Sequence, residues 1–288
     1  VVEDVEALVA CAARHPEHAA PAAGRALEQI ARRSPAPVEG ALLALDLDGP
    51  LGAALLPAVA VIGDEATSDR LQAALSADDA RTRRAAVHAL PSLGHARALE
   101  LAGFALADED LDVQVAAVQV LLRIRNERGE PVGAPTLRLA LRSGAEPVVA
   151  AAARALGAIG DATSIPELRE LATNAGPGVA VSALEALHAL ADPGLEQVLG
   201  SALARGDEEV VKQALRALAD LPGARAARLA PALEHAAWDV RALAAQLLAG
   251  LGDRDAARAL RARLAHEDDA TARAAIREAL DRLEGGSP

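Results

Sequence analysis

Apolar residues recur at intervals of three and four along most of the chain, which is the spacing of one face of an α-helix. Leu168 and Leu171 show this spacing, as do Leu260 and Leu264. A second, more specific pattern follows such stretches: alanine, a mostly aliphatic residue, a variable residue, a small residue and leucine. It occurs as AVHAL at 86–90, AARAL at 152–156, ALEAL at 183–187 and ALRAL at 214–218. These patterns predict an all-helical chain in which one kind of helix is used repeatedly.

The helical pattern repeats with a period close to thirty residues. Glycine-containing segments, which helix C-termini favour, mark the period: VIGD at 61–64, SLGH at 92–95, AIGD at 158–161 and GLGD at 250–253. Division at these points gives seven units, 65–95, 96–126, 127–161, 162–192, 193–223, 224–253 and 254–285. Unit 127–161 is longer because of the segment NERGEPVGAP, which we expect to be a loop insertion. Each unit reads as two helices that cannot bury their apolar faces alone, so the repeat predicts an α-solenoid of stacked helical hairpins.

The first 64 residues follow the pattern less regularly. We expect two divergent capping hairpins there, because the end of a solenoid must present a polar outer face. The helices expected in them span 3–15, 22–33, 38–45 and 51–62. With a frayed tail at 286–288, the sequence predicts a single solenoid over 1–288 with about nine hairpins.

The strings that carry the repeat resemble HEAT repeats, specifically the short bacterial variety named after phycobilisome lyases. DVRALAAQLLAGLGD at 239–253 and VVAAAARALGAIGD at 148–161 show the likeness most clearly, and it extends over 65–285. The resemblance implies that the second helix of each hairpin lines a concave binding face. It also implies a scaffold or adaptor more often than an enzyme.

The variable residue of the core pattern predicts which side chains line that face. One residue per second helix is expected to be exposed: His88, Gln119, Arg154, Glu185, Arg216, Gln246 and Glu278. One helical turn earlier lie Arg84, Val115, Ala150, Val181, Lys212, Ala242 and Ala274. These two ladders, together with the basic residue Arg81 just before them, give the candidate partner-binding residues: Arg81, Arg84, His88, Gln119, Arg154, Glu185, Lys212, Arg216 and Gln246.

Positive and negative side chains both occur along these two ladders. Arg81, Arg83, Arg84 and His88 form a basic start, and Lys212 with Arg216 a second basic spot. We therefore expect an acidic or mixed segment of another protein, either a helix or an extended peptide. For any one of these residues, a merely solvated position on an amphipathic helix is the alternative.

The overall charge narrows the choice of partners. The formal net charge is −12, and Phe104 and Trp238 are the only aromatic residues. Nucleic-acid binding relies on cations that neutralise phosphates, and anionic membranes attract basic segments, so we expect neither partner. The longest apolar stretch, 51–62, is too short to cross a bilayer. We expect a bacterial, cytoplasmic protein.

Candidate metal and turn motifs are incomplete. Cys11, His15 and His18 could approach one another, but zinc prefers four ligands and Pro16 interrupts the helix between the histidines. The segment DLDG at 46–49 lacks the remaining ligands of a calcium loop and reads as a turn. Acidic clusters recur just before second helices, where carboxylates cap backbone N–H groups. We expect no metal and no cofactor.

The resemblance also brings three kinds of enzyme into consideration. Deoxyhypusine hydroxylases hold iron with several His–Glu pairs, of which only His266–Glu267 is present, in a turn. Alkylpurine DNA glycosylases use tryptophan and a carboxylate, for which Trp238, Asp239 and Arg241 are a faint match; a lone tryptophan is more often a packing residue. Phycobilin lyases share the repeat but no identifiable site residue. We therefore expect a non-catalytic scaffold, with a chromophore-handling subunit of the phycobilin-lyase type as the alternative.

Overall fold

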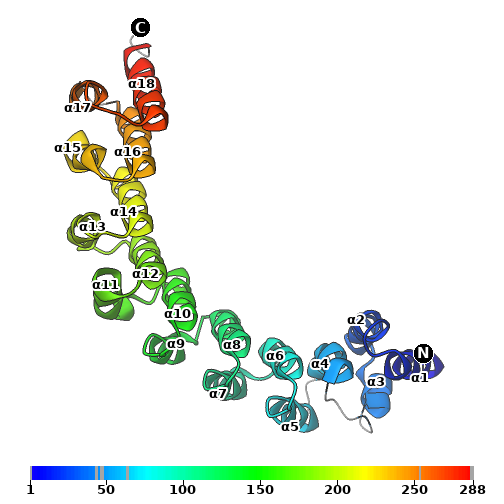
Figure 1. Ribbon diagram of the computed structural model, residues 1–288. Helices are drawn as coiled ribbons and strands as arrows, with labels where there is room; N and C mark the ends of the chain where they lie inside the picture. The colour runs from blue at the N-terminus through cyan, green and yellow to red at the C-terminus, as the bar shows by residue number, and fades with distance from the viewer. Residues whose placement is uncertain (1, 43–44, 46–48, 63–64, 253, 286–288) are drawn as a thin grey trace. The chain divides into compact units, whose positions relative to one another are not determined.

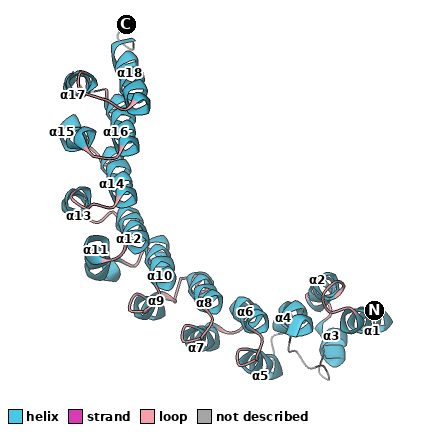
Figure 2. Cartoon of the chain, viewed as in Figure 1, coloured by secondary structure: helices cyan, strands magenta, loops and turns pink. Residues whose placement is uncertain are grey.

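The computed structural model describes residues 2–42, 45, 49–62, 65–252 and 254–285 (Figure 1). Within these ranges the regular structure is helical, apart from one isolated antiparallel bridge between Arg125 and Pro131 (Figure 2). The predicted all-α class is confirmed. The chain divides after Ile159 into two compact units, Val1–Ile159 and Gly160–Pro288, which are described separately below.

Unit 1 contains five helical hairpins. Its α-helices are α1 (Val2–Arg14), α2 (Ala20–Ala31), α3 (Pro35–Leu42), α4 (Gly49–Ile62), α5 (Glu65–Ala74), α6 (Ala80–Ala89), α7 (His95–Ala105), α8 (Leu111–Arg123), α9 (Ala134–Ala140) and α10 (Glu146–Ile159). The second helices α2, α4, α6, α8 and α10 each pack on the next. Helices α5, α7 and α9 form the other layer (Figure 1).

Unit 2 repeats this design in four hairpins. Its α-helices are α11 (Ile165–Asn174), α12 (Pro177–Ala189), α13 (Leu195–Leu203), α14 (Glu208–Asp220), α15 (Ala226–Leu229), α16 (Trp238–Leu251), α17 (Arg254–Leu264) and α18 (Ala270–Gly285). The second helices α12, α14, α16 and α18 pack in succession. Helix α15 is one turn long and continues as the 3₁₀ helix Ala230–Glu234, where Pro231 lacks the N–H that an α-helix would use. Stacked hairpins in both units confirm the α-solenoid.

The core pattern works because only one of its five residues faces outward. In α10, Ala152, Ala153, Ala155 and Leu156 are buried while Arg154 is exposed. Helix α10 packs on α9, the first helix of its hairpin, and on the second helix α8. Since most of the buried residues are alanines, the layers are thin and the helix backbones approach closely.

Gly24 marks the closest approach in unit 1. A Cβ atom at this position of α2 would lie 2.0 Å from the carbonyl oxygen of Ala54 in α4. Any side chain would therefore push the two second helices apart. This contact ties the first divergent hairpin to the second.

The N-terminal region contains four helices near the expected spans, with boundaries that differ by a few residues, and its role as a cap stays a prediction. Helix α3 begins at Pro35, three residues earlier than expected, because proline fits the first turn of a helix. The insertion in unit 127–161 is a loop, as predicted, and closes through the Arg125–Pro131 bridge. The DLDG turn, except Gly49, and the tail 286–288 lie outside the described residues.

Two further predictions concern the chain as a whole. A single solenoid over 1–288 stays a prediction, because the structure describes the two units separately. Among the described helices, none combines the length and the apolar character needed to span a membrane.

Candidate functional site

The variable residue of the core pattern is exposed in each second helix from α6 to α18. These residues, which we call the second-helix ridge, are His88, Gln119 and Arg154 in unit 1 and Glu185, Arg216, Gln246 and Glu278 in unit 2. The sequence pattern therefore places the ridge residues on the surface correctly. Their role in binding stays a prediction.

The surface around the unit 1 part of the ridge is cationic. Arg81, Arg84 and His88 lie exposed on α6, and Arg123 lies exposed at the end of α8. Partial burial and the nearby charges of Arg84 and Arg123 lower the pKa of His88. The imidazole is therefore neutral at pH 7, and the positive charge comes from the arginines. Arg84 approaches Asp112 at 3.6 Å, but an exposed pair of this kind contributes little.

Arg123 was missed by the sequence pattern, although it lies on the same surface. It follows Gln119 by four residues, and residues four apart are neighbours on a helix. Extending the ridge by one turn toward the helix C-terminus would have found it.

An apolar cleft of about 420 Å³ lies between α8 and α10. Helix α8 contributes Val115, Val118, Gln119 and Leu122, and α10 contributes Pro147, Ala150, Ala151, Arg154, Ala155 and Ala158. Both sets follow the three-and-four spacing of a single helix face. The alanines of α10 leave the hollow, because their side chains end at the β-carbon. The structure thus places two of the predicted binding residues, Gln119 and Arg154, at one cleft.

The second predicted basic spot is largely neutralised. In unit 2, the amino group of Lys212 donates to Glu209 at 2.7 Å and lies 2.6 Å from a carboxylate oxygen of Asp239. Hydrogen bonding to Asp239 and then to Glu209 raises the pKa of Lys212. Only 13% of the Lys212 side chain is exposed, so of the predicted pair Arg216 alone presents its charge outward. The charge that Lys212 was expected to present is therefore partnered within the fold, and its role in binding stays a prediction.

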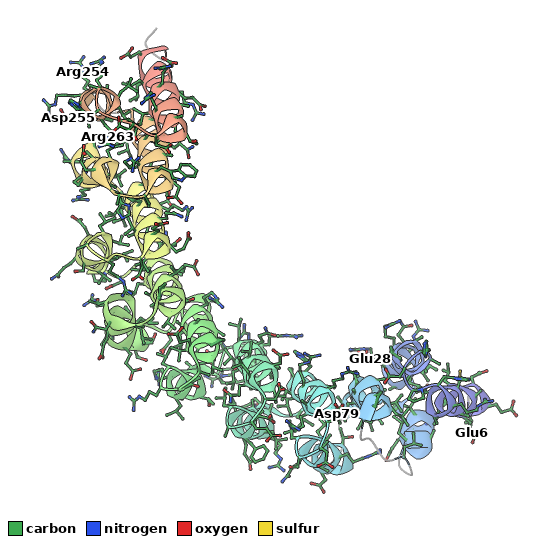
Figure 3. The ribbon with its side chains drawn as sticks, viewed as in Figure 1. Glu6, Glu28, Asp79, Arg254, Asp255 and Arg263 are labelled. Carbon is green, nitrogen blue, oxygen red and sulfur yellow. The ribbon has the colours of Figure 1, made fainter. Side chains whose placement is uncertain are left out.

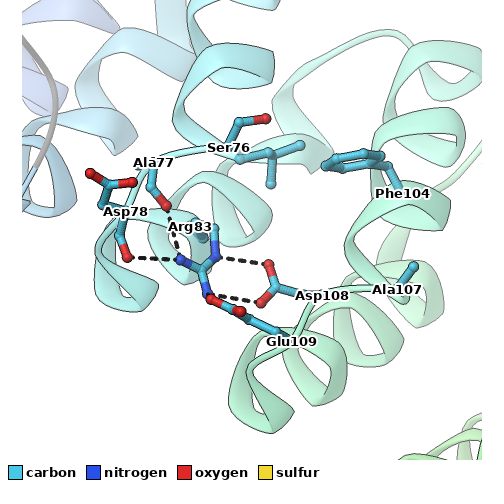
Figure 4. A pocket seen from close by; sticks show the side chains of 9 residues that line it. Ser76, Ala77, Asp78, Arg83, Phe104, Ala107, Asp108 and Glu109 are labelled. Atoms are coloured by element: carbon cyan, nitrogen blue, oxygen red, sulfur yellow. Dashed lines mark hydrogen bonds and ion pairs between the residues drawn. The ribbon is translucent and has the colours of Figure 1, made fainter.

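The predicted basic start of the ridge also changes, because Arg83 is buried. Its Nε and Nη2 atoms donate to the two oxygens of Asp108 at 2.9 and 3.0 Å (Figure 4). Its Nη1 atom donates to the carbonyl oxygens of Ala77 and Asp78 at 2.9 and 3.0 Å. Arg83 therefore joins the turn of its own hairpin to the turn of the next, and it does not belong to the ridge.

The same arrangement occurs in unit 2. Arg241 donates from Nε and Nη2 to the two oxygens of Glu267, each at 2.7 Å. Its Nη1 atom donates to the carbonyl oxygens of His235 and Ala236. We call each of these two pairs, Arg83–Asp108 and Arg241–Glu267, an arginine staple. Its bidentate geometry is the strongest that an arginine makes with a carboxylate.

A second cavity, of about 450 Å³, lies beside the unit 1 staple. Phe104, 59% exposed, and Leu75 form its apolar wall, and Arg83 with Asp108 forms another wall (Figure 4). The three nitrogen atoms of this guanidinium already donate to protein oxygens. We therefore assign this side of the cavity a structural role.

The acidic clusters divide into two roles. Asp79, Asp110 and Asp269 cap second helices as expected: the N–H of Thr82 donates to Asp79 at 3.2 Å, for example. Asp79 is labelled in Figure 3. Asp108 and Glu267 accept the arginines of the staples. Both also accept a backbone N–H as predicted, from Asp110 at 2.8 Å and from Asp269 at 2.9 Å, so each carboxylate serves the turn and the staple together.

The faint glycosylase-like trio does not form a site. Trp238, expected to pack in the core, is 47% exposed at the start of α16. Asp239 pairs with Lys212, and Arg241 belongs to a staple. Both charged members therefore hold the repeat together.

Among the described residues, no three His, Cys, Asp or Glu side chains come close enough to one another to hold a metal ion. Cys11 is an exposed free thiol.

Glu267 should make stability depend on pH. Its hydrogen bonds with Arg241, assisted by the N–H of Asp269 and by Arg263, lower its pKa from 4.5 to about 2 despite burial. A carboxyl group whose pKa is lower in the folded state stabilises the fold above pH 4.5, and that contribution is lost as pH falls toward 2. The free energy of unfolding of the parent should exceed that of Glu267→Gln at neutral pH, and the difference should shrink across this window. Urea denaturation at several pH values measures it, and a constant difference would contradict the assignment.

Stacked helical hairpins, with an exposed variable residue on each second helix from α6 to α18, define an α-solenoid protein built from repeats. Residues 101–187 match the family model described as HEAT repeats. The predicted resemblance to HEAT repeats is confirmed over these residues. No curated protein sequence matches the chain.

Solved structures agree with the fold. The Escherichia coli protein YibA is 18% identical, with 90% of this chain and 96% of that chain covered and a TM-score of 0.56. A homology model of the full-length AP-3 complex is 13% identical, with 100% and 54% covered and a TM-score of 0.63. Importin beta is 16% identical, with 92% and 44% covered and a TM-score of 0.56. The chain thus spans about half the length of the last two proteins, and at these identities the likeness is one of fold.

Proposed function

We propose that this chain is a non-catalytic scaffold or adaptor of the bacterial cytoplasm that binds a segment of another protein along its second-helix ridge. The observation that carries the proposal is the α8–α10 cleft, which is apolar, exposed and bordered by arginines. Apolar hollows with a charged border are typical of surfaces that bind a peptide or helix.

Charge supports an acidic or mixed partner. The chain carries a net charge of −12, yet the exposed charged residues around the unit 1 ridge include Arg81, Arg84, Arg123 and Arg154. A local positive surface on an acidic protein steers negative segments toward itself, whereas the acidic remainder of the surface repels them. Neither a nucleic acid nor a cofactor is part of the proposal.

The test is affinity capture from a lysate of the native cells, with mass spectrometry of the retained proteins. The double variant Arg84→Glu with Arg123→Glu should lose a protein that the parent retains, because it reverses the charge of the surface beside the unit 1 ridge. Its matched control is Arg128→Glu with Arg258→Glu, which changes net charge equally at exposed positions away from the ridge. The control should retain the protein, and circular dichroism should show all three chains folded.

Two results would count against the proposal. Equal loss in the ridge variant and the control would mean that net charge, and not the ridge, governs capture. Retention of an open-chain tetrapyrrole, with no protein partner, would favour the phycobilin-lyase type of function instead.

A further inference from the structure

The α8–α10 cleft has a shape and a charge distribution that specify its occupant more closely than the ridge as a whole does. We propose that it binds an amphipathic helix whose aliphatic stripe enters the cleft and whose flanking residues are Asp or Glu. This inference rests on the proposed function, since it names the class of partner for the same surface.

The length of the cleft fits a helix. Its lining residues span 115–122 on α8 and 147–158 on α10, which corresponds to about 10–17 Å at the rise of an α-helix. A partner helix in such a groove places residues i, i+3 or i+4, and i+7 against it. About two to three turns of partner would therefore be covered.

The floor of the cleft favours aliphatic side chains. On α10, Ala151, Ala155 and Ala158 present only methyl groups, and Val115 with Leu122 forms the facing wall. Alanines let a partner helix approach closely, and the hollow above them takes branched side chains such as leucine. No carboxylate lines the cleft, so a buried cation from the partner would lack a counter-charge there.

The border of the cleft supplies the charge preference. Arg154 is one of its two polar lining residues, and Arg123 directly follows the lining residue Leu122. Both lie toward the C-terminal halves of their helices. Two exposed acidic residues, Asp112 and Glu146, lie at the N-terminal starts of α8 and α10. Carboxylates of the partner should therefore lie over the C-terminal halves of α8 and α10.

The test uses the full chain and a synthetic probe. The probe is a labelled helical peptide of about 18 residues with a leucine stripe flanked by glutamates, and a matched peptide carries lysines in place of the glutamates. Fluorescence anisotropy should show that the acidic peptide binds and that the lysine peptide binds at least about tenfold more weakly. Arg123→Glu with Arg154→Glu should reverse this preference, whereas Arg128→Glu should leave it unchanged.

A second pair of variants tests the cleft itself. Ala151→Leu and, separately, the more exposed Ala158→Leu fill the hollow without changing charge and should each weaken the acidic peptide by about tenfold. Equal binding of the two peptides by the parent, or full binding by both filled variants, would overturn the proposal. If Arg84→Glu with Arg123→Glu loses the captured protein while the filled variants keep it, the scaffold function stands and the inference about the cleft falls. Displacement of the captured protein by the acidic peptide would support both.

Discussion

Replacing Arg241 with alanine should lower the free energy of unfolding of unit 2 by about 3 kcal/mol, the low end of the range for breaking a buried ion pair. The side chain of Glu267 has no exposed surface, so its charge cannot turn to water for solvation when the guanidinium is removed. The carbonyl oxygens of His235 and Ala236 lose a donor at the same time. Arg263 and the N–H of Asp269 remain with Glu267 and limit the loss. Urea denaturation followed by circular dichroism measures the effect.

The control for this prediction is Arg258→Ala. Arg258 pairs with Asp255 in the same unit, but its side chain is 81% exposed, and such a pair is worth less than about 0.5 kcal/mol. The double variant Arg241→Ala with Glu267→Ala should also cost less than the sum of the single variants, because it leaves no buried charge unpaired. Comparable losses for Arg241→Ala and Arg258→Ala would show that the staple does not stabilise the stack.

Replacing Gly24 with alanine should destabilise unit 1 by an amount near the upper end of the about 1–3 kcal/mol that overpacking costs. The added Cβ would lie 2.0 Å from the carbonyl oxygen of Ala54, which belongs to a helix backbone and cannot rotate away. Helices α2 and α4 would have to separate, and contacts along the whole interface would weaken. Thermal denaturation of the variant and the parent measures the loss.

Gly40→Ala is the matched control. Gly40 lies in α3 with nothing within 4 Å of its would-be Cβ, so alanine there should stabilise the helix by about 0.5–1 kcal/mol. The two glycine substitutions should thus have opposite signs. A stabilising Gly24→Ala would mean that α2 and α4 are not packed as described.

The fold was predictable because one short pattern carries most of it. Alanine and leucine at fixed places decide which sides of α6, α10, α12 and α14 are buried, and the same pattern places His88, Arg154, Glu185 and Arg216 on the surface. Helix ends were less predictable. At α3, for example, Pro35 begins the helix earlier than the apolar spacing indicated.

The charged residues were the part that the sequence alone could not resolve. Arg83 and Arg84 are adjacent and identical in type, yet the helix turns one inward to Asp108 and leaves the other exposed. Lys212 looks basic in the sequence, but Asp239, twenty-seven positions later, neutralises it across the stack of second helices. Such ion pairs join residues of consecutive hairpins. The sequence pattern describes one hairpin at a time, so it does not predict which residues pair across two hairpins.

The exposed Trp238 gives unit 2 an optical reporter that unit 1 lacks. It is the only tryptophan, the chain has no tyrosine, and the single phenylalanine, Phe104, lies in unit 1. Intrinsic emission excited in the tryptophan band therefore follows the surroundings of α16 alone, while circular dichroism follows the helices of both units. Coincident melting curves from the two signals would mean that the units unfold as one cooperative block, and separated curves would assign each transition to its unit without any label.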